Sequence, residues 1–118
     1  SAAFQPHPDL AIYAPSNAAF LSLGEAWAAE LAGTGVRFLV ACPGGMQTNF
    51  QRAAGVKTLA SERLMAPARV AERIVRALAR PRTTVIISTR AAGMALVARL
   101  LPRATSVALW KKLMERLR

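Results

Sequence analysis

Two short apolar segments separated by a helical pattern constrain the fold most. In residues 36–42 the apolar side chains fall on both faces of an extended chain, which is typical of a buried strand in a parallel sheet. The β-branched run from Thr83 to Ile87 predicts a second strand. Pro67 is placed to begin a helix between them, and Pro81 marks its end. The sequence therefore predicts a β-α-β unit and the α/β fold class.

Three further segments predict helices. Residues 18–32 repeat large apolar side chains every three or four positions, and Gly33 and Gly35 are suited to end that helix. Residues 91–101 and 105–117 are separated by Pro102. The expected apolar faces are Phe20, Leu23, Trp27 and Leu31 in the first helix, Val70, Ile74 and Leu78 with Ala71 and Val75 in the helix of residues 67–80, and Val107, Trp110, Met114 and Leu117 in the last.

The positive charge lies in the second half of the chain. The net charge is +10, yet residues 1–61 hold three basic and three acidic groups, whereas residues 62–118 hold thirteen basic and three acidic ones. Such asymmetry indicates an anionic partner or, equally, a set of solvated helix faces. Aromatic residues make up only 6% and do not alternate with the basic ones, so we expect no nucleic-acid partner.

Few polar residue types are available for other chemistries. A single cysteine, Cys42, cannot form an internal disulfide, and we expect a reducing, cytoplasmic location. With one histidine, His7, no metal site is expected. The most apolar stretch, residues 85–101, contains Arg90 and Arg99 and is no membrane span. The chain starts at Ser1 without a signal-peptide pattern, as if cut from within a longer protein.

Three segments together resemble the second half of a classical short-chain dehydrogenase/reductase. Residues 13–19 (YAPSNAA) resemble the Tyr-x-x-x-Lys active-site segment, and residues 43–48 (PGGMQT) resemble the Pro-Gly-x-x-x-Thr turn. Residues 65–87 are similar to the family's Pro-initiated helix and last core strand. The resemblance implies the C-terminal portion of a Rossmann-like doubly wound parallel sheet with a helical C-terminal tail. Residues 1–101 would form this partial domain, without its N-terminal half, and residues 102–118 a basic amphipathic helix.

The resemblance also implies site residues and a cofactor, NAD or NADP, whose binding would need the N-terminal half. Tyr13 matches the catalytic tyrosine, and Asn17 stands at the usual lysine position. Counting back from Tyr13 puts the family's serine one position before Ser1, so Ser1 is its neighbour, or its match after a one-residue slip. The implied cofactor-binding residues are Tyr13, Asn17, Pro43, Gly44, Met46 and Thr48, and the implied substrate is a small carbonyl compound or alcohol.

Asn17 is the main departure from the family pattern. A phenol has a pKa of about 10, and an ammonium one helical turn away favours its ionised form. An amide can hydrogen-bond a ribose hydroxyl but brings no charge. We therefore expect a fragment or degenerate oxidoreductase of this family, inactive as an isolated chain, and a homo-oligomer at full length.

The alternative is a non-catalytic membrane-surface or protein-interaction module. It would use the basic C-terminal helices for peripheral contact at the inner face of the membrane, with Trp110 as an interfacial anchor. Half of a Rossmann sheet leaves faces and an edge uncovered. We therefore also expect marginal stability or self-association of the isolated chain.

Overall fold

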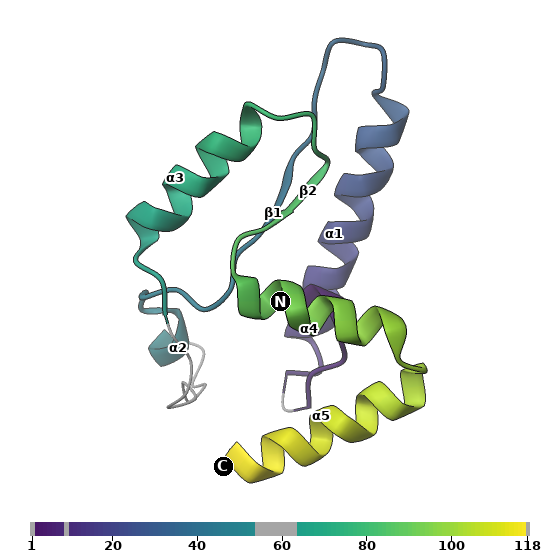
Figure 1. Ribbon diagram of the computed structural model, residues 1–118, viewed down its shortest axis with the longest axis vertical. Coiled ribbons are helices and arrows are strands. Elements are labelled where there is room, and N and C mark those ends of the chain that lie inside the picture. The colour runs from purple at the N-terminus through teal and green to yellow at the C-terminus, as the bar shows by residue number, and fades with distance from the viewer. Residues whose placement is uncertain (1, 9, 54–63, 118) are drawn as a thin grey trace.

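The computed structural model describes residues 2–8, 10–53 and 64–117, and their order of elements is α/β (Figure 1). A 3-10 turn, η1 (Ala2–Phe4), precedes the long helix α1 (Tyr13–Glu30) and strand β1 (Val40–Cys42). The short helix α2 (Phe50–Ala53) comes next, and α3 (Pro67–Leu78) leads to β2 (Thr84–Ile86). Helices α4 (Thr89–Leu100) and α5 (Arg103–Leu117) complete the chain.

The two strands form a parallel pair, as the sequence predicts. Val40 lies opposite Thr84, Ala41 opposite Val85, and Cys42 opposite Ile86. Helix α3 connects them, and Figure 1 shows α1 and α3 on opposite sides of the pair. A parallel pair needs such a crossover, because its strands run in the same direction. The α/β class and the partial Rossmann-like topology are thus confirmed in the described residues.

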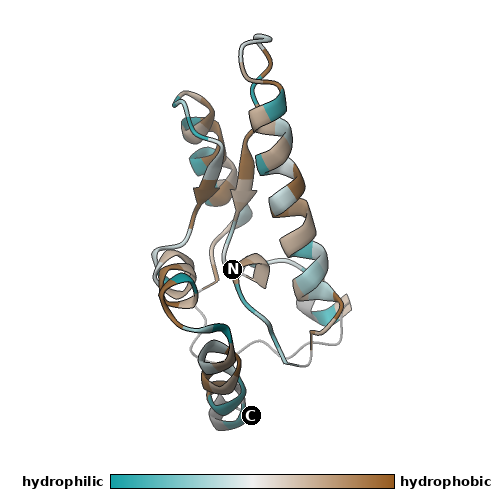
Figure 2. Ribbon diagram, turned by 90° about the vertical axis from the view of Figure 1, so that its right-hand side faces the viewer, coloured by the Kyte–Doolittle hydropathy of each residue, from teal (hydrophilic) through white to brown (hydrophobic). Residues whose placement is uncertain are grey.

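The strands are shorter and less buried than the sequence predicts. Val36 lies outside β1 with its side chain exposed, and no residue of β2 is fully buried. Only Cys42 of β1 is buried. A strand is buried on both faces only where layers cover both, and here two strands meet few covering side chains. Figure 2 shows the strands among the most apolar parts of the ribbon, in keeping with their sequence.

The apolar face predicted for α1 is wrong. The side chains of Phe20, Leu23 and Trp27 are exposed, Phe20 to 72%, and the buried residues of α1 are instead Ala14, Leu21 and Gly24. Gly24 explains which face of α1 is buried, because a Cβ atom there would lie 2.3 Å from Cγ2 of Val40. Helix and strand approach through the smallest residue, which turns the large side chains outward.

The other two predicted faces are corrected in part. In α3 the buried residues are Val70 and Ala77, while Val75 and Leu78 are exposed. In α5 Trp110 is buried and its ring stacks on His7 with centroids 5.8 Å apart, whereas Val107 is exposed. Helix α3 thus buries a narrower stripe than its periodicity predicts, whereas the side chains of Met114 and Leu117 in α5 lie outside the described ones.

The molecule is extended for its size. Its radius of gyration is 15.3 Å, against about 13.5 Å for a compact domain of this length. Its accessible surface is 8383 Å², whereas a compact protein of 12.6 kDa exposes about 6200 Å². Much apolar surface therefore stays open to solvent, which favours the marginal stability or self-association predicted from the sequence.

Candidate active site

Tyr13 stands at the first turn of α1 with its side chain partly exposed. Its ring lies against the ring of Phe50, with centroids 5.3 Å apart and planes inclined by 36°. Phe50 opens α2, a few residues after the end of β1. This aromatic contact joins the start of α1 to α2, the short helix that follows the Pro-Gly turn in the chain.

Asn17 lies one turn along α1 from Tyr13 and folds back on it. Its Nδ2 donates a hydrogen bond to the backbone carbonyl of Tyr13 at 2.7 Å. The hydroxyl of Ser16 donates to the same carbonyl at 2.9 Å. These two bonds hold the first turn of the helix. They leave Asn17 one amide N–H and its carbonyl oxygen for other partners.

The Pro-Gly turn after β1 is held close to the start of α4. A Cβ atom on Gly44 would lie 2.8 Å from Cβ of Ser88, so the approach requires glycine. Ser88 in turn caps α4, because its hydroxyl accepts a hydrogen bond from the backbone N–H of Ala91. Pro43 and Gly44 are therefore placed by a fixed helix end.

The end of this turn is closed by backbone pairing with the residue before α3. The N–H of Met65 donates to the carbonyl of Gly45, and the N–H of Gln47 donates to the carbonyl of Met65, both at 3.0 Å. Met46 and Met65 thus form a parallel bridge. Main-chain atoms therefore hold the end of the turn beside the residue that precedes α3 by two positions.

Thr48 lies two residues after the bridged Met46 and two residues before the start of α2. Its Oγ1 accepts a hydrogen bond from the N–H of Phe50 at 3.3 Å, and its own N–H donates to the carbonyl of Met46. A hydroxyl that accepts here keeps its proton, which it can donate to a carbonyl oxygen in a ligand. Phe50 is therefore joined to Thr48 by a hydrogen bond and to Tyr13 by a ring contact.

Sequence reasoning missed Phe50, because residues 47–61 have the polarity of a long loop. The available signal was local: Thr48 is a capping residue type, and it precedes a short run able to form a helical turn. Ser1 and residues 54–63 lie outside the described residues. The structure thus brings Tyr13 to Phe50, two residues past Thr48, and the roles of Tyr13, Asn17, Thr48 and Ser1 stay predictions.

Cys42 lies at the end of β1 and is buried. Burial raises the pKa of its thiol, because a thiolate loses hydration in the protein interior. His7 is half-buried, and its Nδ1 lies 3.0 Å from the carbonyl oxygen of Pro8. Within the described residues no three potential metal ligands gather, and none of the helices there is long and apolar enough to cross a membrane.

Comparison with known proteins identifies the first half of the chain. The family model described as short chain dehydrogenase matches residues 1–58. This half belongs to the short-chain dehydrogenase family. The match covers α1, β1, the Pro-Gly turn and α2, and so includes Tyr13, Asn17 and Thr48. Comparison with curated proteins and with solved structures finds no significant match.

The short-chain dehydrogenase match stops before α3, but the α/β unit does not. Strand β2 pairs with β1 beyond the matched residues, and Arg37 of the matched half donates a hydrogen bond to the carbonyl of Leu78 at the end of α3. The family segment and the second half are thus parts of one folded unit.

Proposed function

We propose that this chain carries the substrate-side half of a nicotinamide-dependent oxidoreductase that interconverts a small carbonyl compound and an alcohol. The observation that carries the proposal is the Tyr13–Phe50 contact, which brings the phenol of the family-matched segment beside a residue two positions past Thr48. A proton donor and a carboxamide-binding hydroxyl are the two groups that such a reaction needs on this side of the cofactor.

The donor chemistry of the turn fits the nicotinamide end of NAD or NADP. When bound, the nicotinamide ring supplies or accepts the hydride. The Thr48 hydroxyl keeps a proton for the carboxamide oxygen, and the Met46 backbone lies beside it. These two groups would fix the orientation of the ring. The Tyr13 hydroxyl would pass its proton to the substrate oxygen as negative charge develops there.

Asn17 would serve binding rather than acid–base chemistry. Its remaining amide N–H and its carbonyl oxygen can hydrogen-bond the hydroxyls of a ribose. It brings no positive charge to the phenol, which a lysine at this position would do. We therefore expect slow turnover near neutral pH, with binding of the cofactor retained.

The test uses the protein at the length its host makes and follows nicotinamide absorbance with carbonyl substrates. Tyr13→Phe should lower kcat by about a hundredfold or more, because the proton donor is lost while the ring contact with Phe50 remains. Asn17→Lys should raise kcat about tenfold and move the pH–rate profile towards neutrality, because an ammonium about 4 Å from a phenol favours its ionised form.

Ser16→Ala is the matched control, since it removes the other hydrogen bond to the Tyr13 carbonyl without changing charge, and it should leave kcat within about twofold. Turnover that survives Tyr13→Phe unchanged would remove the phenol from the reaction. Failure of all variants to bind NAD and NADP would overturn the proposal as a whole.

Substrate identity, oligomeric state and location follow as further proposals. A small carbonyl compound or alcohol as substrate, a homo-oligomer and a cytoplasmic location with peripheral contact at the inner membrane face all remain predictions. For the last of these, Trp110 is buried against His7, so the exposed apolar side chains that α5 could present to a membrane are Val107, Leu109 and Leu113.

A further inference from the structure

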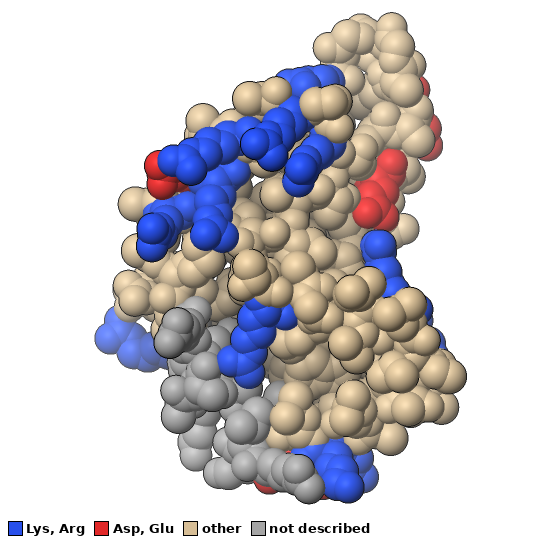
Figure 3. All heavy atoms as spheres, viewed as in Figure 1, with Lys and Arg blue, Asp and Glu red and all other residues tan. Residues whose placement is uncertain are grey.

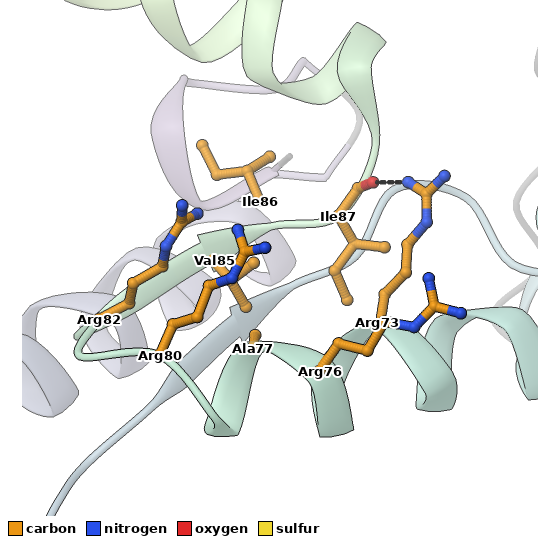
Figure 4. A pocket seen from close by; sticks show the side chains of 8 residues that line it. All are labelled: Arg73, Arg76, Ala77, Arg80, Arg82, Val85, Ile86 and Ile87. Atoms are coloured by element: carbon orange, nitrogen blue, oxygen red, sulfur yellow. Dashed lines mark hydrogen bonds between the residues drawn. The ribbon is translucent and has the colours of Figure 1, made fainter.

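A hollow lined by arginines lies between α3 and β2 (Figure 4). Its volume is about 230 Å³, below the roughly 300–1,000 Å³ of sites for drug-sized ligands. Val85, Ile86 and Ile87 form an apolar wall. Arg73 and Arg76 reach it from α3, while Arg80 and Arg82 come from the connection to β2. The space suits a small, highly charged group rather than a whole metabolite.

The charges around the hollow are unbalanced. Its lining holds four arginines and neither aspartate nor glutamate. Glu72 forms an ion pair with Arg76 at 2.6 Å, and one nitrogen of Arg73 donates to the carbonyl of Ile87. The guanidinium groups of Arg80 and Arg82 have no side-chain partner within residues 2–8, 10–53 and 64–117. Guanidinium groups that line one small hollow repel each other, and a bound anion would reduce this repulsion.

Support of the helix end does not account for these arginines. Cations near a helix C-terminus stabilise its dipole, and Arg37 already donates to the carbonyl of Leu78 at 2.6 Å. Arg82 lies beyond the helix, and Figure 4 shows its guanidinium and that of Arg80 near the β2 wall rather than at the last turn of α3. Figure 3 shows basic side chains gathered over the region of α3 on this face of the molecule.

We propose that this hollow binds a multiply charged phosphate group. Guanidinium groups donate paired hydrogen bonds in the geometry that phosphate oxygens accept, and several of them around one small space select for high negative charge. The apolar wall of β2 gives the uncharged body of the ligand a surface to lie on. The phosphate belongs either to a soluble phosphate compound or to a lipid headgroup, since both present the same oxygens. The lining of the hollow includes neither Tyr13 nor any residue of the turn 43–48.

The experiment titrates the chain with inorganic pyrophosphate by isothermal calorimetry. The variant Arg80→Gln with Arg82→Gln removes the two unpartnered guanidinium groups and should weaken pyrophosphate binding at least about tenfold. The matched control, Lys111→Gln with Lys112→Gln, removes the same charge from exposed positions of α5 and should change the affinity less than about twofold. Circular dichroism verifies that both variants keep the helical content of the parent chain.

A second arm identifies the source of the phosphate. Vesicles of phosphatidylcholine, with and without phosphatidic acid, are floated with the same variants. Loss of vesicle binding only in the arginine variant assigns a lipid headgroup, whereas loss of pyrophosphate binding alone assigns a soluble compound. Equal loss of pyrophosphate binding in both variants would show attraction by net charge only and overturn the proposal. Absence of pyrophosphate binding together with vesicle binding that ignores the arginines would overturn it as well.

Discussion

The two halves of the chain share one fold but differ in surface chemistry. Residues 1–61 are neutral, match the short-chain dehydrogenase family almost throughout, and carry Tyr13, Asn17 and Thr48. Residues 62–118 carry the whole net charge and lie beyond the match, yet β2 continues the parallel pairing that β1 begins. The backbone topology therefore extends further than the recognisable sequence. Pairing geometry constrains few side chains, so the second half is free to carry arginines where the first carries the proposed reaction site.

The largest expected effect on stability comes from replacing a helical glycine by alanine in each half of the chain. Gly24→Ala should destabilise the protein by about 1–3 kcal/mol, because the new Cβ atom would lie 2.3 Å from Val40 and must push α1 from β1. Gly93→Ala, in α4, has nothing within 4 Å and should stabilise by up to about 1 kcal/mol through helix propensity.

Urea unfolding followed by circular dichroism measures both changes. Adding Val40→Ala should recover part of the loss caused by Gly24→Ala, since it removes the atom that clashes. Equal gains in stability from the two glycine substitutions would contradict the close packing of α1 on β1.

Helix and strand positions were largely predictable from the sequence, and buried faces were not. Periodicity, Pro67, Gly33 and Gly35 place the elements within a few residues, and both glycines adopt the positive φ of 84° that only glycine readily tolerates. Hydrophobicity alone assigned Phe20 and Trp27 to the core. In the structure α1 contacts β1 through Gly24. A pattern of apolar side chains does not predict such a contact, because glycine has no side chain to count.

The candidate site was half predictable for a similar reason. The motifs place Tyr13 and Thr48 on their own segments, because each depends on local sequence. The contact of Tyr13 with Phe50, two residues past Thr48, is a long-range contact between α1 and α2. Neither residue carries a local mark of that partner, so only the folded chain reveals it.

A smaller effect concerns Cys42, at the end of the first-half strand. Because burial raises the pKa of its thiol in the folded state, the unfolded chain ionises first as pH rises. The free energy of unfolding should be insensitive to this group below its ordinary pKa of about 8.5 and fall as pH rises above it.

Denaturant unfolding at a series of alkaline pH values measures this dependence, with Cys42→Ala as the reference that lacks it. A thiol reagent should label the native thiol about tenfold more slowly than the unfolded one. Native labelling as fast as in denaturant would show that the end of β1 is not packed as described.

The smallest effect lies in the second half. Glu72→Gln removes the carboxylate paired with Arg76, yet both side chains are largely exposed, so the loss of stability should stay below about 0.5 kcal/mol. Thermal unfolding at low and high salt measures it. A larger, salt-dependent loss would mean that repulsion among the α3 arginines strains the fold more than their exposure implies.

Main-chain atoms, rather than side chains, make the bridge between Met46 and Met65. Because the N–H of Met65 donates to the carbonyl of Gly45 and the N–H of Gln47 donates to the carbonyl of Met65, this link does not depend on which side chains stand at positions 46 and 65. Related proteins could then carry other side chains at these two positions while the Pro-Gly turn and the start of α3 keep their places.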